Sequence, residues 1–241
     1  MSGRRASDRL IVALDASTLS ETARLARRLQ GLIRYVKIGS ITFTASGPAV
    51  IQRVRALGFD VLLDLKFHDI PSTVEKSCRA AVRHRVWMLT VHASGQREML
   101  EAAVAGAAEE ARRLKISRPK IVGVTVLTSV ESGRPGQVVR RVVELAREAQ
   151  TAGLDGVVAS AQEAPAIRRH LGPRLGIVCP GIRPAGVEVC DQQRVSTPRQ
   201  ALASGADWLV VGRPITGAPD PRAAARQILA EMEDRHGVNQ R

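Results

Sequence analysis

The sequence predicts a single-domain α/β fold, the (β/α)8 or TIM barrel. Eight short apolar segments alternate with segments of helical pattern along the chain, which is the order that such a barrel requires. The apolar segments lack strict polar alternation, as expected for parallel strands that are covered on both faces. The length of 241 residues also fits, since α/β barrels of about 200–250 residues fold as one domain.

The first half of the chain contains four predicted strand and helix units. Strands are expected at residues 10–15, 35–39, 61–65 and 87–92, and the helices that follow them near residues 19–31, 48–57, 71–84 and 97–114. Ser17 can cap the first of these helices, Gly58 stops the second, and Pro71 suits the first turn of the third.

The second half repeats the pattern with one exception. Strands are expected at residues 121–128, 156–160, 175–179 and 207–212, and helices near residues 137–150, 164–170, after 198 and at 222–234. The exception is the connection at residues 180–198, which is long enough for a lid or a binding loop. A floppy insertion is the simplest interpretation of such length, but Arg183 and Gln192 within it favour binding.

The composition limits the core and the partners. Only three Phe, two Trp and one Tyr are present, so the core must consist of Val, Leu, Ile and Ala. The formal charge of +13 comes from 31 Arg and 5 Lys, which are dispersed over outward helix faces and would steer anionic substrates. This surface lacks a basic stripe interleaved with aromatic residues, so no nucleic-acid partner is expected.

The ends of the chain are predicted to be short tails. We expect a basic N-terminal tail at residues 1–8, the barrel domain at residues 9–236 and a C-terminal tail at residues 237–241. Residues 1–8 have no apolar stretch of signal-peptide length, and no window approaches a membrane span. The three cysteines show neither a CxxC pair nor metal spacing. We therefore expect a cytoplasmic protein with no membrane partner.

One segment, residues 60–73, joins an apolar strand to the charged run D-x-K-x-x-D-I-P-x-T. Asp64 and Lys66 are two residues apart in the strand, so they project from the same face, and Asp69 follows at its exit. We expect the two carboxylates and the ammonium to converge, because unpaired buried charges cost several kcal/mol each. A structural ion pair is the simplest interpretation of a lone Asp-x-Lys, but the full run indicates a site.

Polar residues follow most of the predicted strands. Lys37 lies within an apolar strand and therefore requires an anion. Active sites of these barrels lie at the carboxyl ends of the strands, and the loops after strands seven and eight often bind phosphate. We expect one pocket to contain Asp15, Lys37, Asp64, Lys66, Asp69, His92, Thr128, Ser129, Arg183, Gln192, Gly212 and Arg213. The backbone N–H of Gly212 and the guanidinium of Arg213 suit a substrate that carries a phosphate.

No metal or cofactor is expected. The five histidines, His68, His84, His92, His170 and His236, show no HExxH motif and no paired ligand spacing. His92, at a strand end, is interpreted as a structural hydrogen-bonding residue rather than a ligand.

Eight segments spanning nearly the whole chain carry a resemblance to a known family. They are LIVALD (10–15), VKIG (36–39), DLKFHDIPST (64–73), VHASG (91–95), VTVLTS (124–129), PGIRP (180–184), the Asp-Gln pair at 191–192 and DWLVVGRPIT (207–216). In these segments the chain resembles the orotidine 5'-phosphate decarboxylases, and the third-strand and eighth-strand motifs are highly specific together. One departure is Gln96, where a second glycine is expected, and it affects no reacting group.

The resemblance implies decarboxylation of orotidine 5'-monophosphate to UMP and CO2, the last step of de novo pyrimidine nucleotide synthesis, without a cofactor. It assigns Lys66 as the proton donor to C6, Asp64 as the carboxylate set against that of the substrate, and Lys37 and Asp69 as the rest of an alternating charged array. It also implies a homodimer in which Asp69 and Thr73 reach the neighbouring subunit's site. The residues implied to bind substrate are Asp15, Lys37, Asp64, Lys66, Asp69, Ile70, Thr73, Thr128, Ser129, Arg183, Gln192, Gly212 and Arg213.

Within that set, the resemblance assigns Asp15 and Lys37 to the ribose hydroxyls, and Thr128 and Ser129 to the ribose or base. Gln192, Gly212, Arg213 and Arg183 are assigned to the phosphate and its closing loop.

Two other functions remain open. A sibling metal-dependent sugar-phosphate decarboxylase or aldolase would share D-x-K-x-x-D, but such enzymes place a glutamate ligand on strand two, where this chain has Lys37. A non-catalytic nucleotide or RNA binder would use the basic surface, and its affinity would fall steeply with salt. A decarboxylation assay with and without EDTA distinguishes these alternatives.

Overall fold

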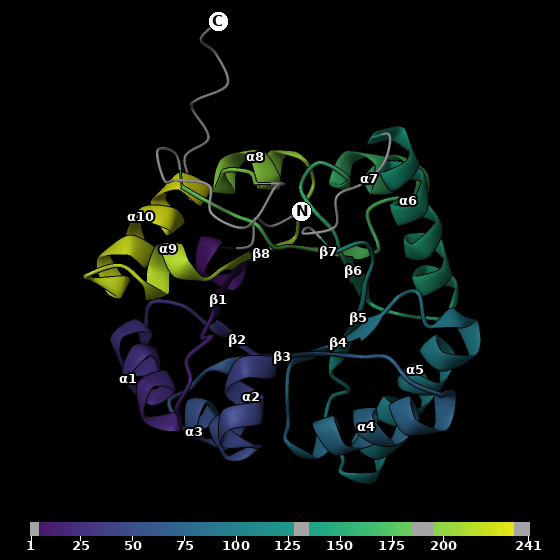
Figure 1. Ribbon diagram of the computed structural model, residues 1–241, viewed down its shortest axis with the longest axis horizontal. Helices are drawn as coiled ribbons and strands as arrows, with labels where there is room; N and C mark the ends of the chain where they lie inside the picture. Colours follow the sequence, from purple (N-terminus) through teal and green to yellow (C-terminus); the bar gives the residue numbers. More distant parts are fainter. Residues whose placement is uncertain (1–4, 128–134, 185–194, 234–241) are drawn as a thin grey trace, which may run out of the picture.

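The computed structural model describes residues 5–127, 135–184 and 195–233, and its strands form a closed parallel barrel (Figure 1). Each strand pairs with the next in chain order, and β1 pairs with β8 to close the ring. The strands are β1 (Leu10–Ala13), β2 (Tyr35–Gly39), β3 (Asp60–Phe67), β4 (Met88–His92), β5 (Lys120–Val124), β6 (Gly156–Val158), β7 (Gly176–Cys179) and β8 (Trp208–Val211). The predicted (β/α)8 barrel is confirmed.

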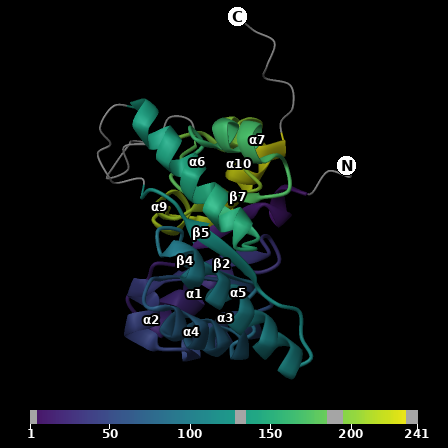
Figure 2. The same cartoon turned by 90° about the vertical axis from the view of Figure 1, so that its right-hand side faces the viewer.

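The helices form a layer around the strands (Figures 1 and 2). After a 3-10 turn, η1 (Ala6–Asp8), they are α1 (Leu19–Leu29), α2 (Ser40–Ser46), α3 (Ala49–Ala56), α4 (Pro71–Arg83), α5 (Gln96–Arg113), α6 (Pro135–Thr151), α7 (Ala164–Leu171), α8 (Pro198–Ala203), α9 (Arg213–Thr216) and α10 (Pro221–Glu233). The short helices α2 and α9 were not predicted. None of the helices in the described ranges is both long and apolar enough to cross a membrane.

Local sequence explains where several helices begin. The cap of α1 is Thr18, not Ser17, because the Thr18 hydroxyl accepts a hydrogen bond from Glu21 N at 3.2 Å. Pro71 begins α4, as predicted. A capping box begins α8, in which Thr197 and Gln200 each accept the other's backbone N–H with their side chains.

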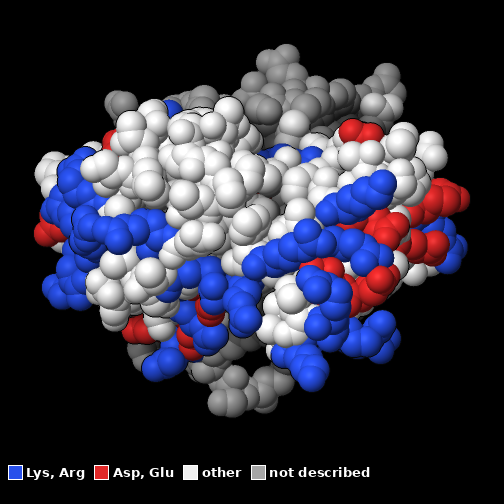
Figure 3. Space-filling model, turned by 90° about the horizontal axis from the view of Figure 1, so that it is seen from below, with Lys and Arg blue, Asp and Glu red and all other residues white. Residues whose placement is uncertain are grey.

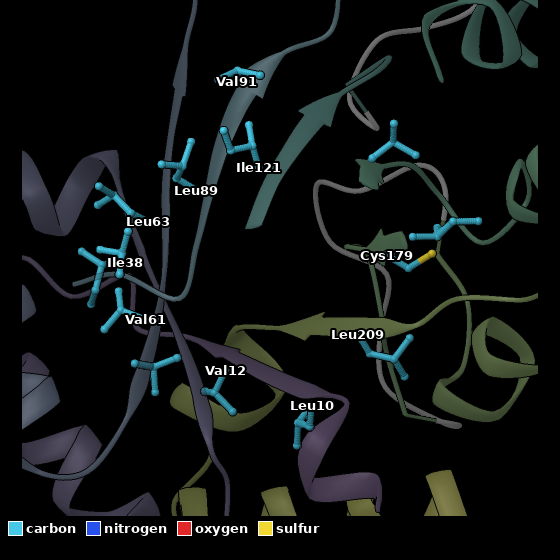
Figure 4. Close-up of a cluster of buried hydrophobic side chains, with 14 of the residues drawn as sticks. Leu10, Val12, Ile38, Val61, Leu63, Leu89, Val91, Ile121, Cys179 and Leu209 are labelled. Carbon is cyan, nitrogen blue, oxygen red and sulfur yellow. The ribbon is translucent and has the colours of Figure 1, made fainter. Parts of the chain in front are cut away.

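The main core lies between the strands and the helices. Alternate strand residues, including Leu10 and Val12 on β1, Leu63 on β3 and Leu89 on β4, point away from the barrel axis and are at most 2 % exposed (Figure 4). They pack against the apolar faces of the helices, as the period of two along a strand requires. Val, Leu, Ile and Ala make up most of this core, as predicted, and Phe59 and Met99 are also buried in it.

The other alternate residues fill the barrel interior, and aromatic rings close its amino end. Trp87 stacks on Tyr35 with ring centroids 3.9 Å apart and meets Trp208 edge-on at 5.6 Å. Tyr35 and Trp208 belong to a second buried cluster that also includes Leu62 and Met88, and Trp87 packs against it. Two residues further along those strands the side chains are Asp64 and Thr90, so these two polar side chains lie towards the opposite, carboxyl end.

Many of the arginines are paired with acidic residues. On the side of α4 and α5, basic and acidic side chains interleave on the surface (Figure 3). There Glu110, only 1 % exposed, accepts hydrogen bonds from both Arg83 and Arg113, each at 2.7 Å. On the same two helices, Arg79 pairs with Glu75 and Glu109. The arginine excess is thus partly neutralised locally rather than gathered into one basic stripe.

Candidate active site

The carboxyl ends of the strands surround a cavity of about 520 Å³. All eight strands, or the residues directly after them, contribute to its wall, and its volume is typical of sites for small molecules. Seven of the predicted site residues line it, namely Asp15, Lys37, Asp64, Lys66, Arg183, Gly212 and Arg213. The prediction that residues from distant parts of the chain meet in one pocket is therefore confirmed for these seven.

Lys37 occupies the centre of a group of carboxylates. Its Nζ lies 2.9 Å from Asp15 Oδ1 and 3.5 Å from Asp64 Oδ2, and only 14 % of its side chain is exposed. The anion that a lysine within an apolar strand requires is thus supplied by two neighbouring strands, β1 and β3. Because an ammonium fills the space between these two carboxylates, they are poorly arranged to share a divalent cation.

Asp64 is the most enclosed carboxylate of the cavity. One oxygen, Oδ2, accepts a hydrogen bond from Lys66 Nζ at 2.9 Å, and the other, Oδ1, accepts one from the Thr90 hydroxyl at 3.0 Å. Burial on its own would raise the pKa of Asp64, but Lys37, Lys66 and these two hydrogen bonds together lower the pKa below its usual value. Asp64 is therefore held as an anion between two ammonium groups.

Lys66 lies at the boundary between the paired carboxylate and the open cavity. Its side chain is 34 % exposed, more than those of Lys37 and Asp64, so its ammonium can meet a bound molecule without leaving Asp64. Its backbone φ is +52°, a left-handed conformation that is uncommon for non-glycine residues. The backbone conformation of β3 therefore sets the direction in which the Lys66 side chain leaves the strand.

Arg183, Gly212 and Arg213 line the cavity on the side of β7 and β8. The Arg183 backbone N–H donates to Ser196 O at 3.0 Å, and Ile182 pairs with Ser196 in an isolated bridge. The two described ends of the predicted long loop are thus joined at its base. Three predicted binding residues, Thr128, Ser129 and Gln192, lie outside the described residues.

Asp69, Ile70 and Thr73 do not line the cavity of their own chain. All three are exposed, and Asp69 Oδ1 accepts a hydrogen bond from the Ile70 N–H at 2.7 Å. Asp69 and Ile70 line a separate open hollow together with Gln96 and Met99. The expectation that two carboxylates from residues 60–73 converge on Lys66 is therefore wrong within one chain, where only Asp64 of that segment contacts its ammonium.

In the described part of the chain, no three His, Cys, Asp or Glu residues are grouped so that they could hold a metal ion. His92 lies beside His68, with ring centroids 5.2 Å apart. Burial, followed by the charges of His68 and Lys66, lowers the pKa of His92 against the opposing effect of Asp64. The structural hydrogen bond predicted for His92 stays a prediction.

Several features of the cavity were not predicted. Thr90 on β4 is 1 % exposed and contacts both Asp64 and Lys66. Gly39 makes room for the Lys37 ammonium. Ile41 and Leu127, which are 59 % and 40 % exposed, form an apolar part of the rim. The available signal for Thr90 was its position two residues after Met88, on the same strand face.

Comparisons with known proteins agree with this geometry. The sequence model of the "Orotidine 5'-phosphate decarboxylase / HUMPS family" matches residues 8–228. An orotidine 5'-phosphate decarboxylase from Nitrosococcus oceani is 47 % identical over 232 residues, which cover 94 % of this chain and 98 % of that protein. One from Moorella thermoacetica is 50 % identical over 235 residues, 95 % of this chain and 93 % of that protein.

A solved structure is similar as well. The crystal structure of orotidine 5'-phosphate decarboxylase from Lactobacillus acidophilus superposes with a TM-score of 0.82 at 34 % identity, covering 94 % of this chain and all of the other. The similarity therefore extends over the barrel as a whole and is not confined to the motifs at the cavity.

Proposed function

The chain belongs to the orotidine 5'-phosphate decarboxylase / HUMPS family, and we propose that it converts orotidine 5'-phosphate to UMP and CO2, the last step of de novo pyrimidine nucleotide synthesis. The observation that carries the proposal is the Lys66 ammonium, which lies 2.9 Å from the enclosed Asp64 carboxylate and faces a cavity of suitable size. The curated relatives support the same activity by name over nearly the full chain.

The charge array suits the difficult step of this reaction. Loss of CO2 leaves negative charge on a vinyl carbon, C6 of the pyrimidine, with no ring position over which it can spread. A fixed positive charge at that carbon stabilises the developing anion. Lys66 supplies this charge and then the proton that replaces CO2, while the ion pair with Asp64 holds the ammonium in place. Crowding of the substrate carboxylate by Asp64 would add ground-state destabilisation.

The rest of the cavity gives the substrate its orientation. In our proposal Arg183, Arg213 and the Gly212 N–H bind the phosphate, together with Gln192 from the long loop. Asp15 and Lys37 bind the ribose hydroxyls, and Thr128 and Ser129 the ribose or base. Contacts to a phosphate that does not react supply binding energy that is used at the transition state, and they would help to close the loop.

A homodimer completes the array in this proposal. Asp69 and Thr73 are exposed and lie away from the cavity of their own chain. Ile70, an apolar side chain that is 63 % exposed, lies between them in the sequence. We propose that this segment packs on a second copy, so that Asp69 and Thr73 reach its cavity and Asp69 becomes the second carboxylate beside the partner subunit's Lys66.

The metal-dependent sibling activity is less well supported. The matched family is named for HUMPS proteins as well as for orotidine 5'-phosphate decarboxylase. The two relatives described above, however, are both named orotidine 5'-phosphate decarboxylase. Lys37 Nζ also lies between Asp15 and Asp64, where it repels a cation.

We further propose that the protein acts in the cytoplasm, since the described cysteines, Cys78 and Cys179, are free thiols.

The test is a spectrophotometric assay in which the absorbance of orotidine 5'-phosphate declines when enzyme is added. The wild-type chain should be active with and without EDTA. Lys66→Ala should lose the activity while its circular dichroism and oligomeric state stay unchanged. Lys115→Ala, which removes an exposed lysine beyond the end of α5, is the matched control and should remain active. Activity that EDTA abolishes would favour the sibling, and activity in Lys66→Ala would overturn the role of Lys66.

A further inference from the structure

The strand that carries Asp64 and Lys66 is irregular where it passes β4. Leu63 is paired with Leu89 and Phe67 with Val91, with a shift of register between them. Residues 64–66 of β3 thus lie opposite one residue of β4, Thr90. Such bulges leave backbone groups without ladder partners and redirect side chains, and they occur often beside active sites.

Thr90 provides the contacts that the ladder lacks at this point. Its Oγ1 accepts a hydrogen bond from the Lys66 backbone N–H at 2.9 Å and donates one to Asp64 Oδ1 at 3.0 Å. A hydroxyl has one hydrogen to donate and lone pairs to accept, so both bonds can form at once. One buried side chain thereby links the backbone of Lys66 to the carboxylate that pairs with its ammonium.

This link acts on the part of Lys66 that is constrained. Lys66 has a φ of +52°, which lysine does not prefer, so surrounding bonds must stabilise the conformation. The bond to Thr90 anchors the backbone N–H, and the Lys66–Asp64 ion pair anchors the ammonium at 2.9 Å. Since Thr90 also fixes the other oxygen of Asp64, the orientation of the ion pair depends on this hydroxyl at both ends.

We propose that Thr90 is a positioning residue for the decarboxylation, whose hydroxyl holds the bulge of β3 and the Asp64–Lys66 pair in the reactive arrangement. The inference rests on the proposed function and deepens it, since Thr90 acts through two groups that touch the substrate. It specifies that the hydroxyl, rather than the volume of the side chain, is the required feature. Serine should therefore replace Thr90 and valine should not.

The surroundings of Asp64 allow a second readout. The charged and titratable groups that face it are Lys37 from β2, Lys66 from its own strand and His92 from β4, with Asp15 of β1 behind Lys37. None of them changes in a Thr90 variant. Loss of the Thr90 hydroxyl removes one contact that stabilises the Asp64 anion and so raises the pKa of Asp64. The decrease in rate on the acid side of the pH profile should therefore occur at higher pH.

The experiment compares Thr90→Val and Thr90→Ser with the wild type in the decarboxylation assay across pH. We expect kcat of Thr90→Val to fall by about tenfold or more, because a hydrogen bond to a charged group and the orientation of the proton donor are lost. KM should change much less, because phosphate and ribose contacts are unaffected. Thr90→Ser should restore kcat and the pH profile to near the wild-type values.

Controls separate this role from a structural one. Thr22→Val removes a fully buried hydroxyl that donates to Thr18 O at 2.8 Å on α1, and it should lower stability without changing kcat or the pH profile. If Thr90→Val does not fold, Thr90→Cys against Thr90→Ser gives the same contrast at equal size, since a thiol is a weak hydrogen-bond donor.

The outcomes are distinct. A wild-type chain without activity on orotidine 5'-phosphate would refute the proposed function itself. An active wild type together with a Thr90→Val variant of unchanged kcat and acid limb would refute the positioning role alone. The same holds if Thr90→Ser is as impaired as Thr90→Val.

Discussion

A Cβ atom on Gly39 would stand 2.8 Å from the Nζ of Lys37. It would also lie 3.2 Å from Asp15 Oδ1, the nearest partner of that ammonium. Cβ atoms essentially never come within 2.8 Å of another atom, so the absence of a side chain at Gly39 is what allows the Lys37 ammonium to lie where it does, between the carboxylates of Asp15 and Asp64. The requirement is steric, since the φ of Gly39 is −98° and suits any residue.

Gly39→Ala should therefore impair catalysis more than folding. The added methyl group displaces the Lys37 ammonium from Asp15 and Asp64, and a displacement of this kind is expected to reduce kcat/KM by about tenfold or more, ~1.4 kcal/mol at the transition state. The measurement is steady-state decarboxylation together with the melting temperature. The matched control is Gly136→Ala on α6, where an added Cβ meets no atom within 4 Å. It should keep full activity, and an equal loss in both variants would contradict the steric argument.

The pH dependence follows from the depressed pKa of Asp64. A carboxylate whose pKa lies below its usual 3.8 is still charged at that pH, so its catalytic contribution is lost only as the pH falls further, through the folded-state pKa. The pH profile of kcat/KM reports the ionisation of groups in the free enzyme and the free substrate. We expect protonation of Asp64 to cause no decrease in kcat/KM above about pH 4. Rates measured after return to pH 7 control for unfolding. The second pKa of the substrate phosphate is about 6, so the informative range lies below it, and an acid limb with a midpoint of about pH 4.5–5.5 would mean that burial outweighs Lys37 and Lys66.

The order of strands and helices could be predicted because each barrel strand is a short apolar run with a recognisable stop. Helix α2 was missed because Ile41, Thr42 and Phe43 have side chains that favour strands. Tertiary contacts override that preference, since the Thr42 hydroxyl donates to Leu14 O and Ala16 O at 2.7 and 2.9 Å. Helix α9 has four residues, too few for a helical period to be detected.

The site could be predicted where it depends on strand ends, which topology alone places together. Lys37 and Asp64 required only the period of two along a strand and the rule that barrel sites lie at carboxyl ends. The extension of β3 to Phe67 and the contact of Thr90 with Lys66 depend on a bulge, which shifts register without leaving a hydrophobic pattern. Closeness in the sequence predicts that Asp69 lies beside Lys66, but within one chain Asp69 is exposed and does not line the cavity.

Glu110 should make the α4–α5 face sensitive to acid. Hydrogen bonds from Arg113 and Arg83 lower the pKa of Glu110 to about 2 from 4.5, against the opposing effect of burial. The folded-state pKa is depressed, so Glu110 stabilises the protein above pH 4.5, and this contribution is lost as the pH falls towards 2. Glu110→Gln should lower the melting temperature at pH 7, with a difference from wild type that shrinks on acidification.

The comparison for Glu110 is Glu144→Gln on α6. Glu144 is 50 % exposed and lies 3.4 Å from Arg141, so its removal should change the melting temperature little at any pH. If Glu110→Gln and Glu144→Gln behave alike, the paired arginines do not stabilise the α4–α5 face.

Gln96 occupies a backbone conformation that suits glycine. Its φ is +66°, at the first residue of α5, which explains why related sequences are expected to have glycine here. Gln96→Gly should raise the free energy of unfolding by about 0.5–1 kcal/mol, because relief of left-handed strain exceeds the added entropy of the unfolded chain. Urea denaturation measures this. Ala105→Gly, at an exposed position inside the same helix, should instead destabilise by a similar amount, and destabilisation in both variants would show that Gln96 is not strained.

The proposed contribution of Asp69 to the cavity of the neighbouring subunit can be tested with hybrid dimers. Lys66→Ala and Asp69→Ala should each be nearly inactive alone, since each lacks one charge of the array. In a hybrid of the two chains, one cavity combines the intact Lys66 of one chain with the intact Asp69 of the other, while the second cavity has neither. Mixing the variants under conditions that allow subunit exchange should therefore restore activity. If Asp69 acted on the cavity of its own chain, every cavity in the mixture would lack one charge and the mixture would stay inactive.

The control mixes Asp69→Ala with a chain that carries both Lys66→Ala and Asp69→Ala. No pairing of these chains supplies Asp69, so the mixture should be inactive. Activity in this control would show that Asp69 is dispensable.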